Sequence, residues 1–283
     1  MSQNPVSAAA LVAAGIVMSG TALAQGGFGP QEPAISQVRD NIYMIRSAAS
    51  GNITALVADD GVLLIDTKFE REYDRYMELL RTVTDQPVRY VINTHMHPDH
   101  TGGNARLEGI EAKIIATGNA RRRLSVSQPT GLPSITFDDH VRLWFGGKPL
   151  DLYWLGRGHT DGDLVILMPE DGIVFTGDLF AGYGPNIRLI DYAGGGSLTE
   201  WPATLDRVLA LEFDLVIPGH SGPTDRAMLQ QYRDEKIRMQ EIIREMHGAG
   251  RSPQEIQTAL NGEFGNMSFV ILPGIQAAID ELQ

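Results

Sequence analysis

The sequence contains no cysteine among its 283 residues. This absence excludes both a disulfide framework and a thiolate metal site, so that any metal must be bound by His, Asp or Glu. Basic residues are also the minority, because 23 Lys and Arg face 35 Asp and Glu and give a formal net charge of −12. Nucleic-acid-binding proteins usually carry a basic surface, so this balance argues against a nucleic-acid partner.

Charged side chains are absent from residues 1–24. An apolar run, Ala8–Met18, precedes a T-A-L-A tetrapeptide that ends at Ala24, and this order is typical of a signal peptide with its cleavage site. The run is too short to span a bilayer comfortably. We therefore predict a signal peptide at 1–24, a flexible Gly/Pro-rich lead-in at 25–34, and a periplasmic or secreted mature protein without a stable membrane span. A leader that is unstructured or anchors the chain is the alternative.

Short segments rich in β-branched residues recur after the lead-in, with Asp, Asn and Gly turns between them. The first four predict an antiparallel meander: Ile35–Val38, Ile42–Arg46, Ile53–Ala58 and Val62–Ile65. Further along, the chain again reads as strands, then helices, then more strands. That order predicts an α/β protein made of two related halves, packed sheet to sheet with helices outside.

Amphipathic periodicity predicts the main helices at 69–84, 197–211, 225–247 and 252–260. In the second of these, Ser197 and Glu200 have the spacing of a capping box. Residues 125–133 contain two prolines and a glycine and are predicted to form a loop. We expect one domain over 35–283 with a C-terminal helical extension, and the final twenty residues show no period that places them.

The stretch from Thr94 to Asn104 concentrates the chemistry of the chain. It reads T-H-M-H-P-D-H-T-G-G-N and follows a strand-like run, Val88–Ile92. Residues i and i+2 of an extended segment point to the same side, so His95 and His97 face one position, while Asp99 and His100 turn toward a second. Imidazole and carboxylate ligands favour zinc. Each metal position needs further ligands, and three later strand ends supply them: His159, Asp178 and His220. The other two histidines, His140 and His247, have simpler interpretations as a solvated turn residue and a helix-terminal residue.

Together these motifs resemble the metallo-β-lactamase superfamily. H-x-H-x-D-H at 95–100 is followed by G-H-T at 158–160, G-D at 177–178 and G-H at 219–220, in the order and spacing typical of that family. Each later motif is weak alone, whereas the set is specific. The resemblance covers about residues 35–247. It implies a four-layer αββα sandwich with the metals at the sheet edges.

The resemblance also implies two Zn²⁺ per chain. The first zinc would be held by His95, His97 and His159. The second would be held by Asp99, His100 and His220, and Asp178 would bridge the two. Zinc lowers the pKa of bound water from about 15.7 to about 7, so the implied nucleophile is a hydroxide that bridges both ions.

Four further residues receive roles through the same resemblance. Asp99 is the candidate catalytic residue, because its carboxylate can orient the nucleophile or transfer its proton. Asp66, at a strand end, corresponds to an acid that orients metal ligands. Thr94 and Thr160 are candidates for the same orienting role, and the turn chemistry of strand ends explains them equally well.

Three positions depart from the first subclass of zinc β-lactamases, which the stretch from residue 194 to 221 otherwise resembles. Asp178 stands where a cysteine ligand is expected, and His100 stands where an arginine is expected. Ala181 replaces a lysine that would bind a substrate carboxylate. Arg188 and Arg157 are candidates to replace that lysine, against the simpler interpretation of both as solvated surface residues.

The bridging aspartate instead resembles glyoxalase-II-like thioesterases, lactonases, alkylsulfatases and phosphodiesterases, and Gly177–Phe180 is similar to the glyoxalase II pattern. We therefore predict a secreted dinuclear zinc hydrolase with a small-molecule substrate. β-Lactam amides are the first substrate class, and lactones, thioesters and sulfate or phosphate esters are the alternatives. A mononuclear iron enzyme of the persulfide-dioxygenase type and a non-catalytic metal-binding module stay open. No feature of the sequence indicates an oligomeric state.

Overall fold

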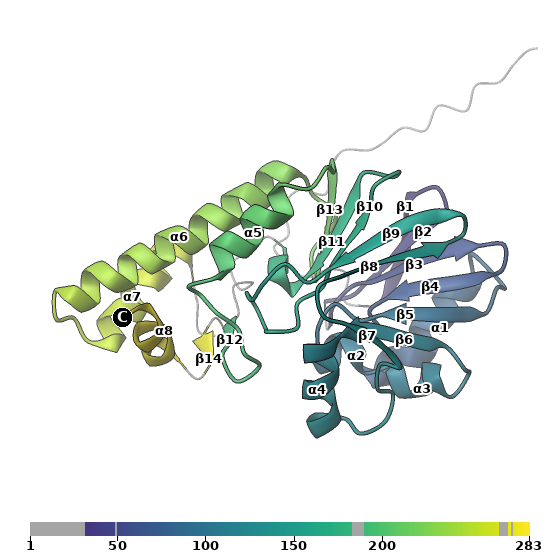
Figure 1. The fold of residues 1–283 in the computed structure, drawn as a ribbon, viewed down its shortest axis with the longest axis horizontal. Coiled ribbons are helices and arrows are strands. Elements are labelled where there is room, and N and C mark those ends of the chain that lie inside the picture. Colours follow the sequence, from purple (N-terminus) through teal and green to yellow (C-terminus); the bar gives the residue numbers. More distant parts are fainter. Residues whose placement is uncertain (1–31, 49, 183–189, 266–270, 273) are drawn as a thin grey trace, which may run out of the picture.

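The structure is a computed structural model that describes residues 32–48, 50–182, 190–265, 271–272 and 274–283. The predicted signal peptide, residues 25–31 of the lead-in, and Arg188 lie outside these ranges. Two sheets pack face to face, and helices cover their outer faces (Figure 1). The predicted α/β class with its αββα order of layers is thus confirmed.

The larger sheet has its strands side by side in chain order. The strands from the first to the fourth are antiparallel, and those from the fourth to the seventh are parallel. They are β1 (Ala34–Arg39), β2 (Ile42–Arg46), β3 (Ile53–Ala58), β4 (Gly61–Ile65), β5 (Val88–Ile92), β6 (Lys113–Thr117) and β7 (Ile135–Phe137). Every residue of β4 is buried, because helices cover one face of this sheet and the second sheet covers the other.

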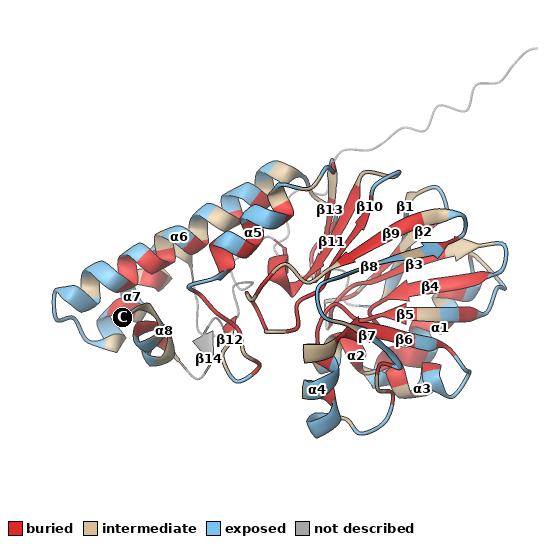
Figure 2. Cartoon of the chain, in the orientation of Figure 1, coloured by how far each residue is buried: buried red, intermediate tan, exposed pale blue. Residues whose placement is uncertain are grey.

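The smaller sheet has the strand order β13-β11-β10-β9-β8. Only the pair of β11 and β13 is parallel among its described pairs. The strands are β8 (His140–Phe145), β9 (Lys148–Tyr153), β10 (Val165–Met168), β11 (Ile173–Gly177) and β13 (Leu215–Pro218). Buried residues run along the central strands, whereas β8 at the edge alternates between exposed and partly buried positions before it ends at the buried Phe145 (Figure 2).

Three apolar clusters correspond to the three interfaces between the layers. The middle cluster lies between the sheets and includes Leu63, Ile92 and Phe175. A second joins the larger sheet to the helix that contains Tyr76. The third joins the smaller sheet to the C-terminal helices around Trp201. Apolar side chains are buried on both faces of both sheets, and this packing holds the strands in place. The polar residues singled out from the sequence lie at the ends of these strands.

The helices are η1 (Glu70–Glu72), α1 (Tyr73–Arg81), α2 (Pro98–Thr101), α3 (Asn104–Glu108), α4 (Gly118–Ser127), η2 (Asp178–Phe180), α5 (Trp201–Leu209), α6 (Arg226–Gly248), α7 (Pro253–Phe264) and α8 (Ile275–Leu282). The helix predicted over 69–84 is shorter, because it opens with the 3₁₀ turn η1 and ends at Arg81. The loop predicted over 125–133 begins later, because α4 continues to Ser127.

The capping box predicted at Ser197 is only half formed. Ser197 Oγ accepts a hydrogen bond from the Glu200 backbone N–H at 3.0 Å. The Glu200 carboxylate does not return to Ser197, because it pairs with Arg157 at 2.5 Å. The helix α5 begins at Trp201, four residues later than the sequence predicts.

Three elements in the C-terminal third of the chain were not predicted from the sequence. Two short strands, β12 (Ile190–Asp191) and β14 (Ile271–Leu272), pair in parallel. The helix α8 follows and packs on α6 and α7. Figure 1 shows this C-terminal group beside β12, away from the larger sheet. Over the described residues, no helix combines the length and apolar content needed to cross a membrane.

Candidate metal centre

The polar residues singled out from the sequence lie at the ends of strands from both sheets. Residues 94–100 follow β5 of the larger sheet. His159 lies between β9 and β10, Asp178 follows β11, and His220 follows β13. Because neighbouring parallel strands end at the same edge of a sheet, the αββα packing brings these loops together.

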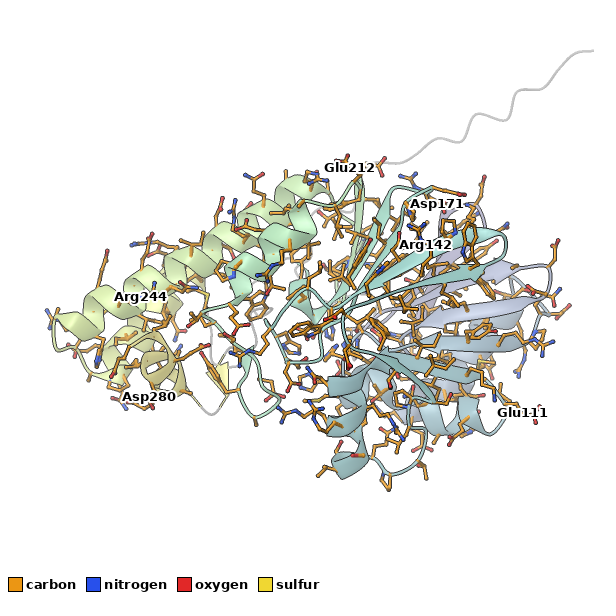
Figure 3. The ribbon with its side chains drawn as sticks, viewed as in Figure 1. Glu111, Arg142, Asp171, Glu212, Arg244 and Asp280 are labelled. Atoms are coloured by element: carbon orange, nitrogen blue, oxygen red, sulfur yellow. The ribbon has the colours of Figure 1, made fainter. Side chains whose placement is uncertain are left out.

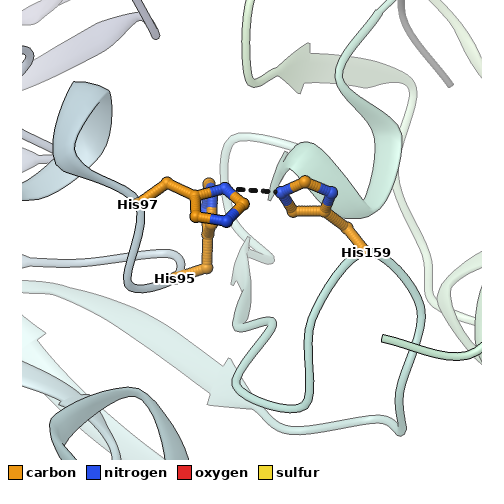
Figure 4. Close-up of side chains that lie close together, drawn as sticks. All are labelled: His95, His97 and His159. Atoms are coloured by element: carbon orange, nitrogen blue, oxygen red, sulfur yellow. Dashed lines mark hydrogen bonds between the residues drawn. The ribbon is translucent and has the colours of Figure 1, made fainter. Parts of the chain in front are cut away.

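Three histidines form the first cluster, defined as His95, His97 and His159 (Figure 4). His97 Nδ1 lies 3.1 Å from His95 Nε2 and 2.9 Å from His159 Nε2. His95 and His159 are buried, and burial holds the pKa of His95 well below its usual range. Three ring nitrogens thus converge where protonation of His95 is unfavourable.

The second cluster consists of Asp99, His100 and His220. Asp99 Oδ2 lies 3.5 Å from His100 Nε2 and 3.4 Å from His220 Nε2. The two imidazole Nε2 atoms are 3.4 Å apart. Three potential ligand atoms from two different loops therefore face one small volume.

Asp178 lies between the two clusters. Its Oδ2 is 3.2 Å from His220 Nε2 and 3.8 Å from His159 Nε2, and its Oδ1 is 3.5 Å from His100 Nε2. Asp178 Oδ1 is buried without a hydrogen-bond partner. A buried carboxylate oxygen without such a partner is costly, and a cation in this position would remove the cost.

Charge in the second cluster favours a bound cation. Burial alone would lower the pKa of His100, but the carboxylates of Asp99, Asp178 and Asp66 raise it to about 10. Burial alone would raise the pKa of Asp178, but His220 and His100 hold it well below its usual range. Carboxylates so placed attract positive charge into the site.

Asp66 orients one histidine of each cluster. Its Oδ2 lies 2.8 Å from His100 Nδ1 and accepts the Thr94 hydroxyl hydrogen at 2.7 Å. Thr94 Oγ1 is in turn 3.1 Å from His95 Nδ1. These contacts assign the ring protons of both histidines to Nδ1 and leave the Nε2 lone pairs directed at the clusters. The geometry supports the orienting roles expected of Asp66 and Thr94.

Asp191 supports His97 in the same way and was not found from the sequence. Its Oδ2 lies 2.8 Å from His97 Nε2, so the Nδ1 lone pair of that ring faces the cluster. Its Oδ1 accepts the Gly194 N–H at 2.8 Å. Burial would raise the pKa of Asp191, but the hydrogen bonds from His97 and Gly194 lower it. No sequence pattern marks this residue, since it lies in an irregular glycine-rich stretch.

Thr160 contacts Asp163 rather than an imidazole. Its backbone N–H donates to Asp163 Oδ2 at 3.0 Å, and its hydroxyl donates to Asp163 Oδ1 at 2.5 Å. Burial raises the pKa of Asp163 to about 7. These bonds shape the turn that carries His159, so any orienting effect of Thr160 acts through the backbone.

Arg157 is engaged in the ion pair with Glu200 described above. Arg188, the other candidate for substrate binding, lies outside the described residues. Arg123 of α4 is also paired, with Asp161 at 2.7 Å. The remaining histidines lie apart from the clusters: His140 contacts Asp151, and His247 contacts Gln283.

The buried side chain of Lys68 binds the segment that packs against His100 of the second cluster. Lys68 Nζ donates to the Gly51 carbonyl at 2.6 Å and to the Ser47 and Ser50 hydroxyls at 3.1 and 3.2 Å. Burial lowers the pKa of Lys68 to about 8. Gly51 packs so closely on His100 that a Cβ there would lie 2.3 Å from the ring.

The next residue, Asn52, holds the loop of His220. Its side-chain amide donates hydrogen bonds to the carbonyls of Pro218 and Ser221 at 2.8 and 2.9 Å. Its backbone N–H donates to the Gly219 carbonyl at 2.6 Å. The Ser50–Asn52 segment thus connects the two loops that contribute histidines to the second cluster.

The sequence model of the metallo-beta-lactamase superfamily matches residues 46–220, a range that includes both clusters and Asp178. The chain belongs to the metallo-beta-lactamase superfamily. This membership confirms the resemblance seen in the motifs and the prediction of a metal-dependent, β-lactamase-like hydrolase.

Other members of the superfamily are similar to this chain over most of their length. A metallo-beta-lactamase type 2 of Bacillus cereus is 27% identical over 210 residues, which cover 69% of this chain and 79% of that protein. One from Bacteroides fragilis is 27% identical over 200 residues, covering 66% and 78%. The solved structure of a metallo-beta-lactamase from Pontibacter korlensis has a TM-score of 0.64 and 20% identity, covering 72% of this chain and 98% of that one. The last likeness shows the shared fold.

Proposed function

We propose that this chain is a secreted dinuclear zinc hydrolase. The first cluster would hold one zinc, the second cluster would hold the other, and Asp178 would contact both. The observation that carries the proposal is the position of Asp178 between the clusters, with one buried oxygen that has no hydrogen-bond partner. All these ligand atoms are nitrogen or oxygen, which suits zinc.

Zinc bound here would act as a Lewis acid and lower the pKa of a water molecule to about 7, which makes a nucleophile available at neutral pH. The protein fixes the ligand rings through Asp66 and Asp191, so that their lone pairs converge before substrate arrives. Ligands held in this way need little reorganisation during the reaction.

The partly exposed residues mark the side from which substrate approaches. The side chains of His97, Asp99 and His220 are 18%, 20% and 15% exposed, whereas those of His95 and His100 are buried. Asp99 is therefore reachable from solvent, and its carboxylate can accept a proton from the nucleophile and deliver it to the leaving group.

β-Lactam amides are the substrate class that we propose first. The two curated relatives are named metallo-beta-lactamases, and the predicted signal peptide suits an exported enzyme. Lactones, thioesters and sulfate or phosphate esters form the second candidate class. Asp178, which stands in place of a cysteine, favours this second class. In addition, no free cation stands at those predicted carboxylate-binding positions that the structure describes, because Ala181 replaces the lysine and Arg157 is paired with Glu200.

The proposal predicts that Asp178→Ala abolishes turnover and releases zinc, because both clusters lose a shared ligand. Zinc content would be measured by elemental analysis, beside turnover of a cephalosporin, an acyl lactone, a glutathione thioester and a sulfate ester. Asp214→Ala is the matched control, because this exposed carboxylate pairs with Arg39 at the opposite end of β13. A variant that kept both ions and full activity would overturn the dinuclear assignment. A single iron ion in the wild type would favour the oxygenase alternative.

A further inference from the structure

Glu281, near the end of the C-terminal helix α8, reaches the segment 191–199 that runs beside the first cluster. Its carboxylate accepts hydrogen bonds from the Ser197 hydroxyl at 2.5 Å, the Leu198 backbone N–H at 2.9 Å and the Tyr192 hydroxyl at 2.9 Å. One side chain thus connects three points of the segment. A carboxylate that accepts several such bonds makes charge-assisted contacts, which are stronger than neutral ones.

The segment 191–199 in turn contacts two of the three histidines of the first cluster. Asp191 Oδ2 binds His97 Nε2, and the Asp191 N–H donates to the His159 carbonyl at 3.0 Å. The Ser197 N–H donates to the Gly158 carbonyl at 2.9 Å. Displacement of the segment would therefore move both the orienting carboxylate of one ligand and the backbone of another.

The rest of the C-terminal group packs where it can hold Glu281 in place. Ile275, Ala278 and Ile279 of α8 are buried in the cluster formed with α5 and α6. The strands β12 and β14 pair through Ile190 and Ile271, one residue before the segment begins. The neighbouring residue Asp280 is exposed and lies at the periphery of the helical group (Figure 3).

We propose that Glu281 is a positioning residue for the first metal cluster, and that the C-terminal helix α8 is thereby part of the machinery of the site. The inference rests on the proposed function, because it assumes that the first cluster binds zinc. Glu281 lies well beyond residues 46–220, over which the chain matches its family. The contact is therefore a feature of this chain that the superfamily match does not contain.

The test compares Glu281→Ala, Glu281→Gln and Asp280→Asn in the full chain. Amide hydrogen exchange would be followed by mass spectrometry, and the affinity for each of two zinc ions by competition with a chromophoric chelator. We expect Glu281→Ala to speed amide exchange in the segment 191–199 and to lower the affinity for one zinc ion by roughly tenfold. This factor is the lower end of the loss of metal affinity seen when a direct hydrogen-bond partner of a ligand is removed. Glu281→Gln keeps an acceptor oxygen and should fall between this variant and the wild type. Asp280→Asn should match the wild type.

A His100→Ala background identifies the affected ion, because it disables the second cluster. The zinc affinity measured in that background is then the affinity of the first cluster. The effect of Glu281→Ala on zinc affinity should persist in that background. Two outcomes overturn the positioning role: unchanged exchange in the segment, or faster exchange with unchanged zinc affinity in both Glu281 variants. If the wild type itself binds no second zinc, the dinuclear proposal fails, while the effect on the remaining ion still tests Glu281.

Discussion

At the scale of single residues, Asp151 shows how one buried carboxylate makes stability depend on pH. It accepts two hydrogen bonds from Arg142 on the neighbouring strand, at 2.7 and 2.8 Å, and lies 3.1 Å from His140. The hydrogen bonds from Arg142 lower the pKa of Asp151 below its usual value. The folded protein therefore favours the ionised form more than the unfolded chain does.

Asp151→Asn should reduce the free energy of unfolding at neutral pH, because an amide cannot carry the charge that Arg142 binds. The stabilisation is present above the pKa of the unfolded chain, about 3.9, and is lost as the pH falls through the lower folded-state pKa. The difference between wild type and variant should thus shrink below about pH 4. Urea unfolding at several pH values would measure it, with the exposed Asp85→Asn as control. A difference that stayed constant down to pH 3 would contradict the assignment.

Asp66 and Asp191 each place a carboxylate oxygen against a histidine ring nitrogen, yet only Asp66 could be predicted. Asp66 ends a β-branched run, and its role was predicted because the motifs resemble those of the metallo-β-lactamase superfamily. Asp191 lies 94 positions from His97 in the chain, inside a glycine-rich stretch without periodicity. A hydrogen bond between residues so far apart leaves no local pattern, and only the folded arrangement reveals it.

At the scale of elements, the strands of the two large sheets were predictable, whereas the two-residue strands β12 and β14 and the four-residue helix α2 were not. Val88–Ile92 was predicted with the bounds that the structure has, because buried β-branched runs give a strong signal. The helix α2 has only four residues and shows no period, although Pro98 at its first turn is a known start signal. Only half of the capping box predicted at Ser197 forms, because a distant arginine binds the Glu200 carboxylate.

The Ser50–Asn52 segment makes a prediction at this scale. Lys68→Met would leave the Gly51 carbonyl and two serine hydroxyls without their buried donor, which should cost about 1–3 kcal/mol of stability. Because Gly51 packs on the His100 ring, the second cluster should also bind zinc more weakly while the first is little affected. Thermal unfolding and a two-site zinc titration would show both effects.

The control for this change is Lys113→Met, which alters an exposed lysine at the start of β6. That variant should keep wild-type stability and both zinc affinities. If Lys68→Met lowered stability but left the zinc affinities equal to those of the control, the lysine would support the fold alone.

At the scale of the whole molecule, the layered sandwich was predictable because each half repeats strands and helices in order. The attachment of the C-terminal helices to the segment 191–199 was not, since the last twenty residues lack a period. Each cluster draws its members from both sheets. The first combines a loop after β5 with the loop between β9 and β10, and the second combines the former with the loop after β13.

Removal of zinc should therefore destabilise the whole sandwich rather than one loop. If zinc is present at about a thousand times the Kd of one site, removal of that one ion costs about 4 kcal/mol, or roughly 10 °C in Tm for a chain of this size. Differential scanning calorimetry with and without a chelator would measure the change, and excess zinc should restore the original Tm. Equal Tm values for both forms would show that the ions do not connect the two halves.

The absence of cysteine has a consequence for the durability of the site. Thiolate ligands are oxidised stepwise to sulfenic, sulfinic and sulfonic acids, and the later steps are irreversible. With Asp178 in the position where a cysteine ligand is expected, no proposed ligand can enter that series. An enzyme exported to an oxidising environment, where thiols are not kept reduced, would keep its ligand set intact and would be insensitive to thiol-directed inhibitors.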